Sequence, residues 1–490
     1  MSNLVSVIGS GFASLAAATT LAAAGEKVHV YEKNESAGGR ARKFESDGFT
    51  FDMGPSWYWM PEVFEKYFNR FGKSVSDYYD LIRLSPSYRV YFGKDDFVDV
   101  PANKKDLFEL FESIEAGSAH ELDLFLKDAA YKYEVGVNKL VYKPSTSILE
   151  FANAEVIGGA LKLNLFSSIA KQINKQFKNE KLRQILKFPV LFLGAKPENM
   201  PSLYTLMNYA DLELGTWYPK GGMHKIVEGM VSLAEEKGVE FHYNSPVENL
   251  VLNKKSVKGV QVRGQQIDSK AVIAGADYHH VDKNLLPESK RMYSEKYWDS
   301  RVLAPSSLLF YLGVNKKLTN LKHHNLFFDT DFTKHSEEIY DQPQWPSDPL
   351  FYVCVPSITD DSVAPTGCEN LFVLMPIAPD LSDNEEMRER YYNILLSRLE
   401  EITGEKIKDN VIYKRSYCVD DFKSDYNSYK GNAYGLANTL TQTAFLKPKL
   451  QNKYLPNLFY TGQLTTPGPG VPPSIISGQV VADFMLNKKL

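Results

Sequence analysis

The stretch Val5-Ser6-Val7-Ile8-Gly9-Ser10-Gly11-Phe12-Ala13-Ser14 decides the fold of this chain. Its apolar start is typical of a buried strand, its glycines of a tight turn, and the residues up to Gly25 of a helix. A second strand, 27–31, is followed at once by Glu32. Gly9 permits the turn, Gly11 lets the backbone approach a pyrophosphate at the positive end of the helix, and Glu32 suits a ribose hydroxyl. The stretch therefore predicts a dinucleotide site.

The residues that follow strengthen this prediction. Ser36-Ala37-Gly38-Gly39-Arg40 places a second pair of glycines and a cation just beyond the acidic strand end. Ser14 stands at the third position of the fingerprint, where Gly or Ala is usual. Because the serine side chain is small, we expect the helix still to pack closely on the strand. An ordinary strand-turn-helix unit without a cofactor is the alternative.

Composition excludes several classes of protein. The chain has 490 residues, enough for two or three structural units. With 56 basic and 60 acidic residues and a net charge of −4, it offers no general attraction for nucleic acid, and none is predicted as a partner. Its three cysteines stand in no CxxC arrangement, which favours a reducing compartment.

His279-His280 and His323-His324 are adjacent pairs whose side chains should diverge, so we predict no metal site.

Membrane signals are weak. The uncharged run from Leu4 to Gly25 lacks a basic leader and is rich in Ala, Gly, Ser and Thr, so it is interpreted as the first strand and helix rather than a signal peptide. We therefore expect a cytoplasmic protein without a transmembrane helix. Residues 155–181 mix apolar side chains with lysines and predict either a basic helix on a membrane surface or a solvated helix packed on the core.

Strand-like signals for nucleotide binding recur in three places: 4–54, 218–277, and 457–462 with the helix that follows. In each place an apolar strand ends on Gly or Asp, as expected where strand ends line a crevice in a parallel sheet. We predict an α/β fold with a discontinuous Rossmann-like domain of 1–85, 218–282 and 452–490. The remaining segments, 86–217 and 283–451, should form a mixed α+β region that binds substrate. The first of these segments is mainly helical by pattern, and the second has strand-like runs at 307–314, 350–355 and 370–375.

Six motifs together carry a resemblance to a known family. They are GSGFAS at 9–14, GGRA at 38–41, FTFDMGPSW at 49–57, YPKGGM at 218–223, PSITDDSVAPTG at 356–367 and TPGPGVP at 466–472. In this order they resemble the bacterial-type carotenoid (phytoene) desaturase family of the flavin-dependent amine oxidase superfamily, over nearly the whole chain. Pro469 and Pro473 stand where that family more often has Ala or Gly.

The resemblance implies FAD as cofactor, a carotene as substrate and desaturation by hydride transfer to the flavin. It further implies a peripheral position at the inner membrane, with the second region contacting the lipid. Only one dinucleotide fingerprint is present, so electrons should leave to a quinone or oxygen. The cofactor residues carried over are Gly9, Gly11, Phe12, Ala13, Glu32, Gly39, Arg40, Val247, Gly462 and Val471.

Several of these residues have implied roles. Val247 should hold the adenine through its main chain, Gly462 should approach the pyrophosphate, and Val471 should lie by the flavin ring. The helix after Pro472-Pro473 should direct free N–H groups, such as those of Ser474 and Ile475, at the ring.

A hydrocarbon substrate calls for an apolar, aromatic tunnel, for which Trp57 and Trp59 are candidates, although such a cluster also suits plain core. Glu150 is the candidate catalytic proton acceptor, against a surface carboxylate with water as acceptor. Two other functions stay open: a carotenoid isomerase that uses reduced flavin, and a non-catalytic isoprenoid-binding protein. An amine oxidase is less favoured, because nothing indicates an aromatic cage.

Overall fold

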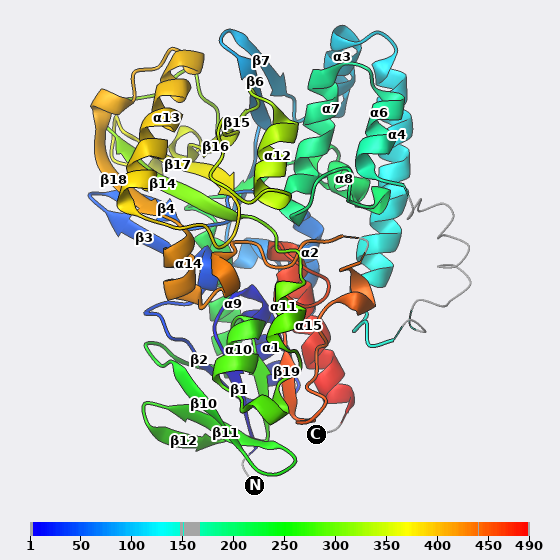
Figure 1. Cartoon of the computed structure of the whole chain (residues 1–490), viewed down its shortest axis with the longest axis vertical. Coiled ribbons are helices and arrows are strands. Elements are labelled where there is room, and N and C mark those ends of the chain that lie inside the picture. The colour runs from blue at the N-terminus through cyan, green and yellow to red at the C-terminus, as the bar shows by residue number, and fades with distance from the viewer. Residues whose placement is uncertain (1–2, 148–149, 151–166, 440, 489–490) are drawn as a thin grey trace.

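A computed structural model of the chain describes residues 3–147, 150, 167–439 and 441–488 (Figure 1). Residues 155–166 of the predicted amphipathic helix lie outside the described residues. Its remainder is not one helix but two, α6 (Ile169–Gln176) and α7 (Glu180–Lys187). The break falls at Phe177, whose backbone is extended, and Asn179 caps α7 by accepting a hydrogen bond from the Lys181 N–H.

A parallel five-stranded sheet forms the lower half of the molecule in Figure 1. Its strands, in spatial order, are β19 (Leu458–Tyr460), β13 (Ala271–Ala274), β1 (Leu4–Ile8), β2 (Lys27–Tyr31) and β9 (Glu240–His242). Every residue of β1 is buried, as expected for a parallel strand that is covered on both faces. All five strands come from the three segments predicted to form the cofactor domain, although the boundaries of that domain stay a prediction.

Three long helices of the described chain pack around this sheet. They are α1 (Phe12–Ala23), α9 (His224–Glu236) and α15 (Val471–Asn487). Helices α1 and α15 approach so closely that a side chain at Gly478 would collide with the Ala13 carbonyl. Small residues along α1 make this approach possible, and α1 is buried over nearly its whole length. The strands β10 (Val247–Leu252), β11 (Val257–Val262) and β12 (Gln265–Asp268) form a separate antiparallel sheet below.

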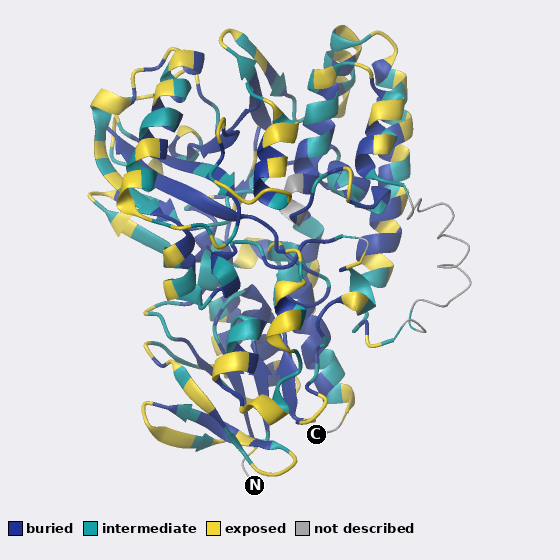
Figure 2. Ribbon diagram, viewed as in Figure 1, coloured by how far each residue is buried: buried dark blue, intermediate teal, exposed yellow. Residues whose placement is uncertain are grey.

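A mixed seven-stranded sheet forms the upper half. Its order is β18 (Val411–Tyr417), β14 (Ser306–Val314), β17 (Glu369–Ile377), β16 (Phe351–Cys354), β15 (His324–Phe327), β6 (Tyr88–Gly93) and β7 (Asp96–Val100). The strand-like runs at 307–314, 350–355 and 370–375 are confirmed as β14, β16 and β17. The hairpin β6–β7 was missed, because its short strands lie in a segment whose pattern is mainly helical. Figure 2 shows β14 as a continuous buried stripe.

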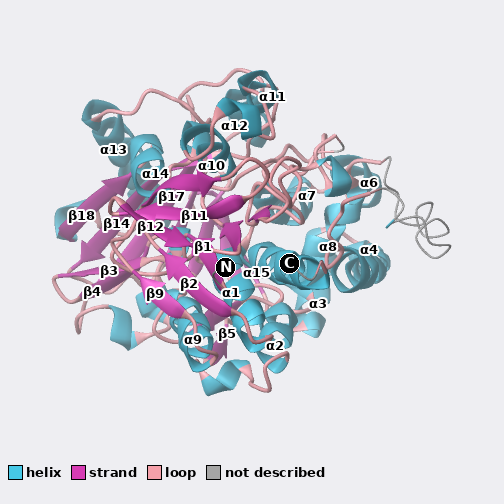
Figure 3. Ribbon diagram, turned by 90° about the horizontal axis from the view of Figure 1, so that it is seen from below, coloured by secondary structure: helices cyan, strands magenta, loops and turns pink. Residues whose placement is uncertain are grey.

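Helices cover the sides of this upper half. They are α3 (Lys104–Ile114), α4 (Ser118–Tyr133), α8 (Leu206–Leu212), α12 (Phe332–Tyr340), α13 (Glu385–Thr403) and α14 (Val419–Tyr426) (Figure 1). Of the other helices, α2 (Pro61–Asn69) packs with α1 and α9, and α10 (Tyr278–Asn284) and α11 (Glu295–Asp299) pack beside the parallel sheet. Seen from below, α3, α4, α6 and α8 gather on one side of the strands (Figure 3). The short pairs β3 (Lys43–Ser46) with β4 (Phe49–Asp52), and β5 (Leu81–Arg83) with β8 (Trp217–Pro219), complete the strands. The predicted α/β fold class is confirmed. Among the described residues, no helix combines the length and apolar character that a membrane crossing needs.

Candidate active site

A cavity of about 530 Å3 joins the two sheets. At one end it is lined by residues that follow the parallel strands, such as Glu32 after β2 and Gly462 after β19. At the other end it is lined by Leu309 of β14 and Leu374 of β17. All ten residues predicted to bind the cofactor line this one cavity: Gly9, Gly11, Phe12, Ala13, Glu32, Gly39, Arg40, Val247, Gly462 and Val471. The structure therefore brings the whole predicted set together.

The glycine turn after β1 leaves its backbone open to the cavity. Gly9 has a φ of +85°, and its N–H donates to the Tyr31 carbonyl at 2.8 Å. A Cβ at Gly11 would meet no atom within 4 Å, so this backbone faces open space. No side chain caps the start of α1, and its first turn carries no acid. Its free N–H groups are thus available to an anion such as a phosphate.

Glu32 is held in place from the protein side. It is 4% exposed, and its carboxylate accepts hydrogen bonds from the Ser10 N–H at 2.9 Å, the Ser10 hydroxyl at 2.7 Å and the Asn34 N–H at 2.9 Å. A carboxylate has about four lone-pair positions, so it can also accept a ribose hydroxyl. These contacts orient Glu32 at the cavity wall before any ligand arrives.

Arg40 gives the strongest sign that an anion fits here. Its Nη2 donates to the Ser428 hydroxyl at 3.0 Å and the Asn432 carbonyl at 3.3 Å, whereas its buried Nε has no hydrogen-bond partner among the described residues. Burial lowers the pKa of Arg40, while nearby Asp277 favours its charged form. A buried donor without an acceptor is costly, and a phosphate oxygen in the cavity would satisfy it. The residues present therefore fit a dinucleotide.

Helix α15 directs its N-terminus at the same cavity, but with fewer free donors than predicted. The Ser474 N–H donates to the Gly470 carbonyl at 3.0 Å, so the expectation that it is free is wrong. Since the helix begins at Val471, Ser474 already makes the first hydrogen bond of the helix. Pro472 and Pro473 have no N–H, which leaves the Val471 N–H at the open end.

The end of the cavity next to the upper sheet is apolar and aromatic. Trp57 and Trp59 both line it, with ring centroids 5.1 Å apart. The Trp59 Nε1–H donates to the Thr216 hydroxyl at 2.9 Å, which fixes the indole. Met60, Met207, Leu309, Phe372 and Leu374 contribute the remaining apolar wall. Such a wall binds its ligand through buried hydrocarbon area.

Glu150 does not join this set. Its carboxylate accepts hydrogen bonds from the N–H groups of Ser145 at 2.9 Å, Thr146 at 2.8 Å and Ser147 at 3.2 Å, and it is not among the residues that line the cavity. These bonds close a turn, as carboxylates near N–H groups commonly do. A catalytic role for Glu150 stays a prediction that no contact supports.

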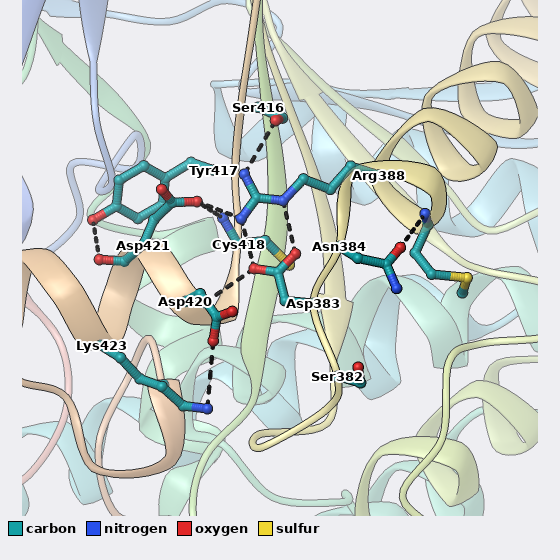
Figure 4. A network of polar contacts seen from close by, with 12 residues as sticks. Ser382, Asp383, Asn384, Arg388, Ser416, Tyr417, Cys418, Asp420, Asp421 and Lys423 are labelled. Carbon is teal, nitrogen blue, oxygen red and sulfur yellow. Dashed lines mark hydrogen bonds and ion pairs between the residues drawn. The ribbon is translucent and has the colours of Figure 1, made fainter.

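Sequence reasoning missed the part of the site that α14 supplies. Phe422, Asp425 and Tyr426 line the cavity, although α14 is far from the other motifs along the chain. Ion pairs hold this helix in place (Figure 4). Arg388 binds Asp383 through two hydrogen bonds of 2.7 and 2.6 Å and lies 2.7 Å from Asp421 at the start of α14. No local sequence signal marks this arrangement.

Among the described residues, two groups of side chains could hold a metal ion. In each of the groups His323, His324, Cys354 and His29, Glu240, His242, the potential ligand atoms lie within 4.8 Å of one another. The predicted divergence of His323 and His324 is wrong: their rings are 4.5 Å apart, because His323 precedes β15 and is not part of a regular strand. Burial raises the pKa of the Cys354 thiol to about 12, which disfavours it as a ligand.

The parallel sheet and its cavity define a protein that holds a dinucleotide cofactor against an apolar compartment. The family of flavin containing amine oxidoreductases matches residues 12–486, and the chain belongs to this family. It is therefore a flavin-dependent oxidoreductase, with FAD as its cofactor.

Proteins of similar sequence match this chain over nearly its full length. It is 41% identical to a carotenoid 3,4-desaturase of Haloarcula japonica, with 99% of this chain and 98% of the relative covered. It is 33% identical to a 4,4'-diapophytoene desaturase of Staphylococcus haemolyticus, over 99% and 98% of the two chains. It is 31% identical to a zeta-carotene-forming phytoene desaturase of Myxococcus xanthus, over 98% and 93%.

Solved structures share the fold at low sequence identity. An oxidoreductase from Methanosarcina mazei superimposes with a TM-score of 0.66 at 17% identity, covering 98% of this chain and 100% of the other. A Rab GDI from Plasmodium falciparum superimposes with a TM-score of 0.58 at 11% identity, covering 99% of each. The fold by itself therefore does not define an activity.

Proposed function

We propose that this chain is an FAD-dependent carotenoid desaturase. The observation that carries the proposal is the single cavity, in which all ten predicted cofactor residues and the apolar wall meet. The relatives at 31 to 41% identity, which are named as carotenoid desaturases, support it. The higher identity to the carotenoid 3,4-desaturase, 41% against 33 and 31%, favours a double bond placed near the end of a carotene over the early steps on phytoene.

Some residues of the cavity would bind the cofactor, and others would hold the substrate and exclude water. Glu32 would hold the ribose, the turn at Gly9 and Gly11 the pyrophosphate, and Arg40 the negative charge of the phosphates. FAD, when bound, accepts a hydride from a carbon of the substrate. The Trp57 and Trp59 rings and the side chains of the upper sheet would hold the polyene in a dry compartment.

We also propose a cellular location and an electron acceptor for the protein. A carotene dissolves in the lipid bilayer, so we infer that the protein works at the cytoplasmic surface of the inner membrane, bound peripherally. The sequence has one dinucleotide fingerprint, which would hold FAD, and no second fingerprint for a nicotinamide cofactor. We therefore infer that the electron acceptor is a quinone or oxygen. Flotation of the purified protein with liposomes, and reoxidation of reduced protein by a quinone without oxygen, test these two points separately.

The decisive experiment combines purified protein, FAD and liposomes that carry one carotene at a time: phytoene, neurosporene, lycopene or γ-carotene. We expect absorption bands at longer wavelength in the extracted carotenoids, because each added double bond extends the conjugation. Leu374→Trp should abolish the product while FAD stays bound, since it fills the apolar end of the cavity. Ile412→Trp, at a site that is 56% exposed, is the matched control.

Two results would contradict the proposal. Conversion between cis and trans isomers without new conjugation would indicate a carotenoid isomerase. Protein that retains FAD but changes none of the four carotenes would favour a non-catalytic binding role.

A further inference from the structure

Two imidazoles and a carboxylate meet at the edge of the parallel sheet. Strand β9 is the edge strand and pairs with β2, so that His29 lies opposite Glu240 and Tyr31 lies opposite His242 (Figure 3). Because alternate residues of a strand point to the same face, Glu240 and His242 project from one face of the sheet. His29 projects from that face as well, since it contacts both of them.

The three side chains lie at distances that suit a shared ion. Nδ1 of His29 is 3.2 Å from Nε2 of His242, and Nε2 of His29 is 3.2 Å from Oε2 of Glu240. Adjacent ligands of a tetrahedral zinc ion are about 3.4 Å apart, because each lies about 2.1 Å from the metal. Small side-chain rotations would therefore direct one nitrogen of each ring and one carboxylate oxygen at a common point.

The rings are held in place, whereas the carboxylate is free to adjust. The His242 ring stacks on the buried Tyr31 ring, with centroids 4.9 Å apart and an angle of 12° between the planes. The His29 side chain is 14% exposed and that of Glu240 is 57% exposed, so an ion can enter from solvent. Burial lowers the pKa of His29, although the Glu240 carboxylate opposes the shift. A neutral imidazole is the form that binds metal ions.

A second surface pair shows what distinguishes this group from an ordinary ion pair. Nε2 of His279 also lies 3.2 Å from a carboxylate oxygen, that of Glu295. There the third neighbour is the Lys283 ammonium, 3.3 Å from the same oxygen. An ammonium repels a metal ion, whereas the second imidazole beside His29 offers it a lone pair.

We propose that His29, Glu240 and His242 bind a divalent transition-metal ion such as Zn2+. Two imidazoles and one carboxylate form a ligand set that zinc uses, whereas Mg2+ and Ca2+ prefer oxygen ligands. The proposal is independent of the proposed function. The sequence-based prediction of no metal considered only adjacent histidines, whereas His29 and His242 are 213 residues apart.

The ion would fasten β9 to β2 beside the dinucleotide end of the cavity. The Glu32 N–H donates to the His242 carbonyl at 2.9 Å, and both Tyr31 and Glu32 line the cavity. An ion that binds only the folded chain stabilises it by mass action. Its role is therefore structural: it holds the strand end that carries Glu32.

Zinc binding to protein without a histidine tag tests the site directly. After treatment with a chelator, the protein is dialysed against Zn2+ in the presence of a competing chelator, and the bound zinc is counted. We expect one ion per chain at this site, and His242→Asn to weaken its binding at least about 10-fold. Glu240→Gln, at an exposed position that tolerates substitution, should weaken binding similarly. His279→Asn is the matched control and should bind zinc like the unmodified protein, and Mg2+ should not replace Zn2+.

Thermal unfolding gives a second readout. Zinc should raise the melting temperature of the unmodified protein and of His279→Asn by about 2 °C or more, but not that of His242→Asn. Unchanged zinc affinity in both His242→Asn and Glu240→Gln would overturn the proposal. Loss of zinc in His323→Gln alone would also overturn it and assign the ion to the buried group instead. Activity on carotenes is measured separately, so neither result bears on the proposed function.

Discussion

The hydroxyl oxygen of Ser14 occupies the space in which a side chain on Gly275 would begin. Helix α1 therefore lies against the end of β13 at a distance that only a glycine at residue 275 permits. This contact connects the glycine turn after β1 to the next strand end that lines the cavity. The larger residue at position 14, where Gly or Ala is usual, is thus accommodated by the glycine at position 275 on the facing strand end.

Gly275→Ala should lower the free energy of unfolding by about 2 kcal/mol, because it overpacks this contact. Ser14→Ala removes the colliding oxygen, which has no hydrogen-bond partner among the described residues. The double variant should therefore recover more than half of the loss, as measured by urea unfolding. A double variant as unstable as Gly275→Ala alone would show that the collision is not the cause.

Glu32→Gln should weaken FAD binding by about 10- to 100-fold, since a charged acceptor for a ribose hydroxyl contributes roughly 1.5 to 3 kcal/mol. Titration of the FAD-free protein with FAD measures the effect. Glu35→Gln, three residues away and exposed, is the control and should bind FAD normally. Equal affinity in both variants would refute the assigned role of Glu32.

Arg388→Leu should lower the free energy of unfolding by about 3 kcal/mol, because it leaves the carboxylates of Asp383 and Asp421 without their cation. Burial alone would raise the pKa of Asp383, yet hydrogen bonds from Arg388 and the Asp420 N–H lower it overall. Arg390→Leu, at an exposed position of the same helix, should have little effect. Similar melting temperatures for the two variants would contradict the importance of the network in Figure 4.

Asp211 should make stability depend on pH. It is 1% exposed, and burial raises its pKa from 3.8 to about 7, although hydrogen bonds from Tyr88 and Thr216 oppose the shift. A carboxyl group that holds its proton more tightly in the folded state stabilises fully below pH 3.8. That contribution is lost as the pH rises from 3.8 toward 7.

Asp211→Asn stays neutral at every pH. Its stability relative to the unmodified protein should therefore rise as the pH increases from 3.8 to about 7 and then stay constant, as measured by thermal unfolding. Asp80→Asn, at an exposed position, is the control and should show no such trend. A pH-independent difference for Asp211→Asn would show that the carboxyl is already ionised in the folded protein.

The sequence alone predicted the dinucleotide half of the site because its signals are local. A strand, a glycine turn and a following acid, such as Glu32, are determined by steric and hydrogen-bonding rules that act over a few residues. The three strand ends were predicted separately, yet they meet since parallel strands end at one edge of a sheet. Even the small residues of α1 could be recognised in advance.

The other half depended on contacts between distant segments. No pattern near residue 420 indicated that α14 would close the cavity, because Arg388 and Asp383 position it through ion pairs. Glu150 had a plausible sequence context, and its carboxylate closes a turn in the structure, so its catalytic role stays a prediction. His29, Glu240 and His242 come together only through the pairing of β2 with β9. A glycine turn or an acidic strand end depends on neighbouring residues and can be predicted from them, whereas the geometry of an apolar pocket arises from the packing of the whole chain.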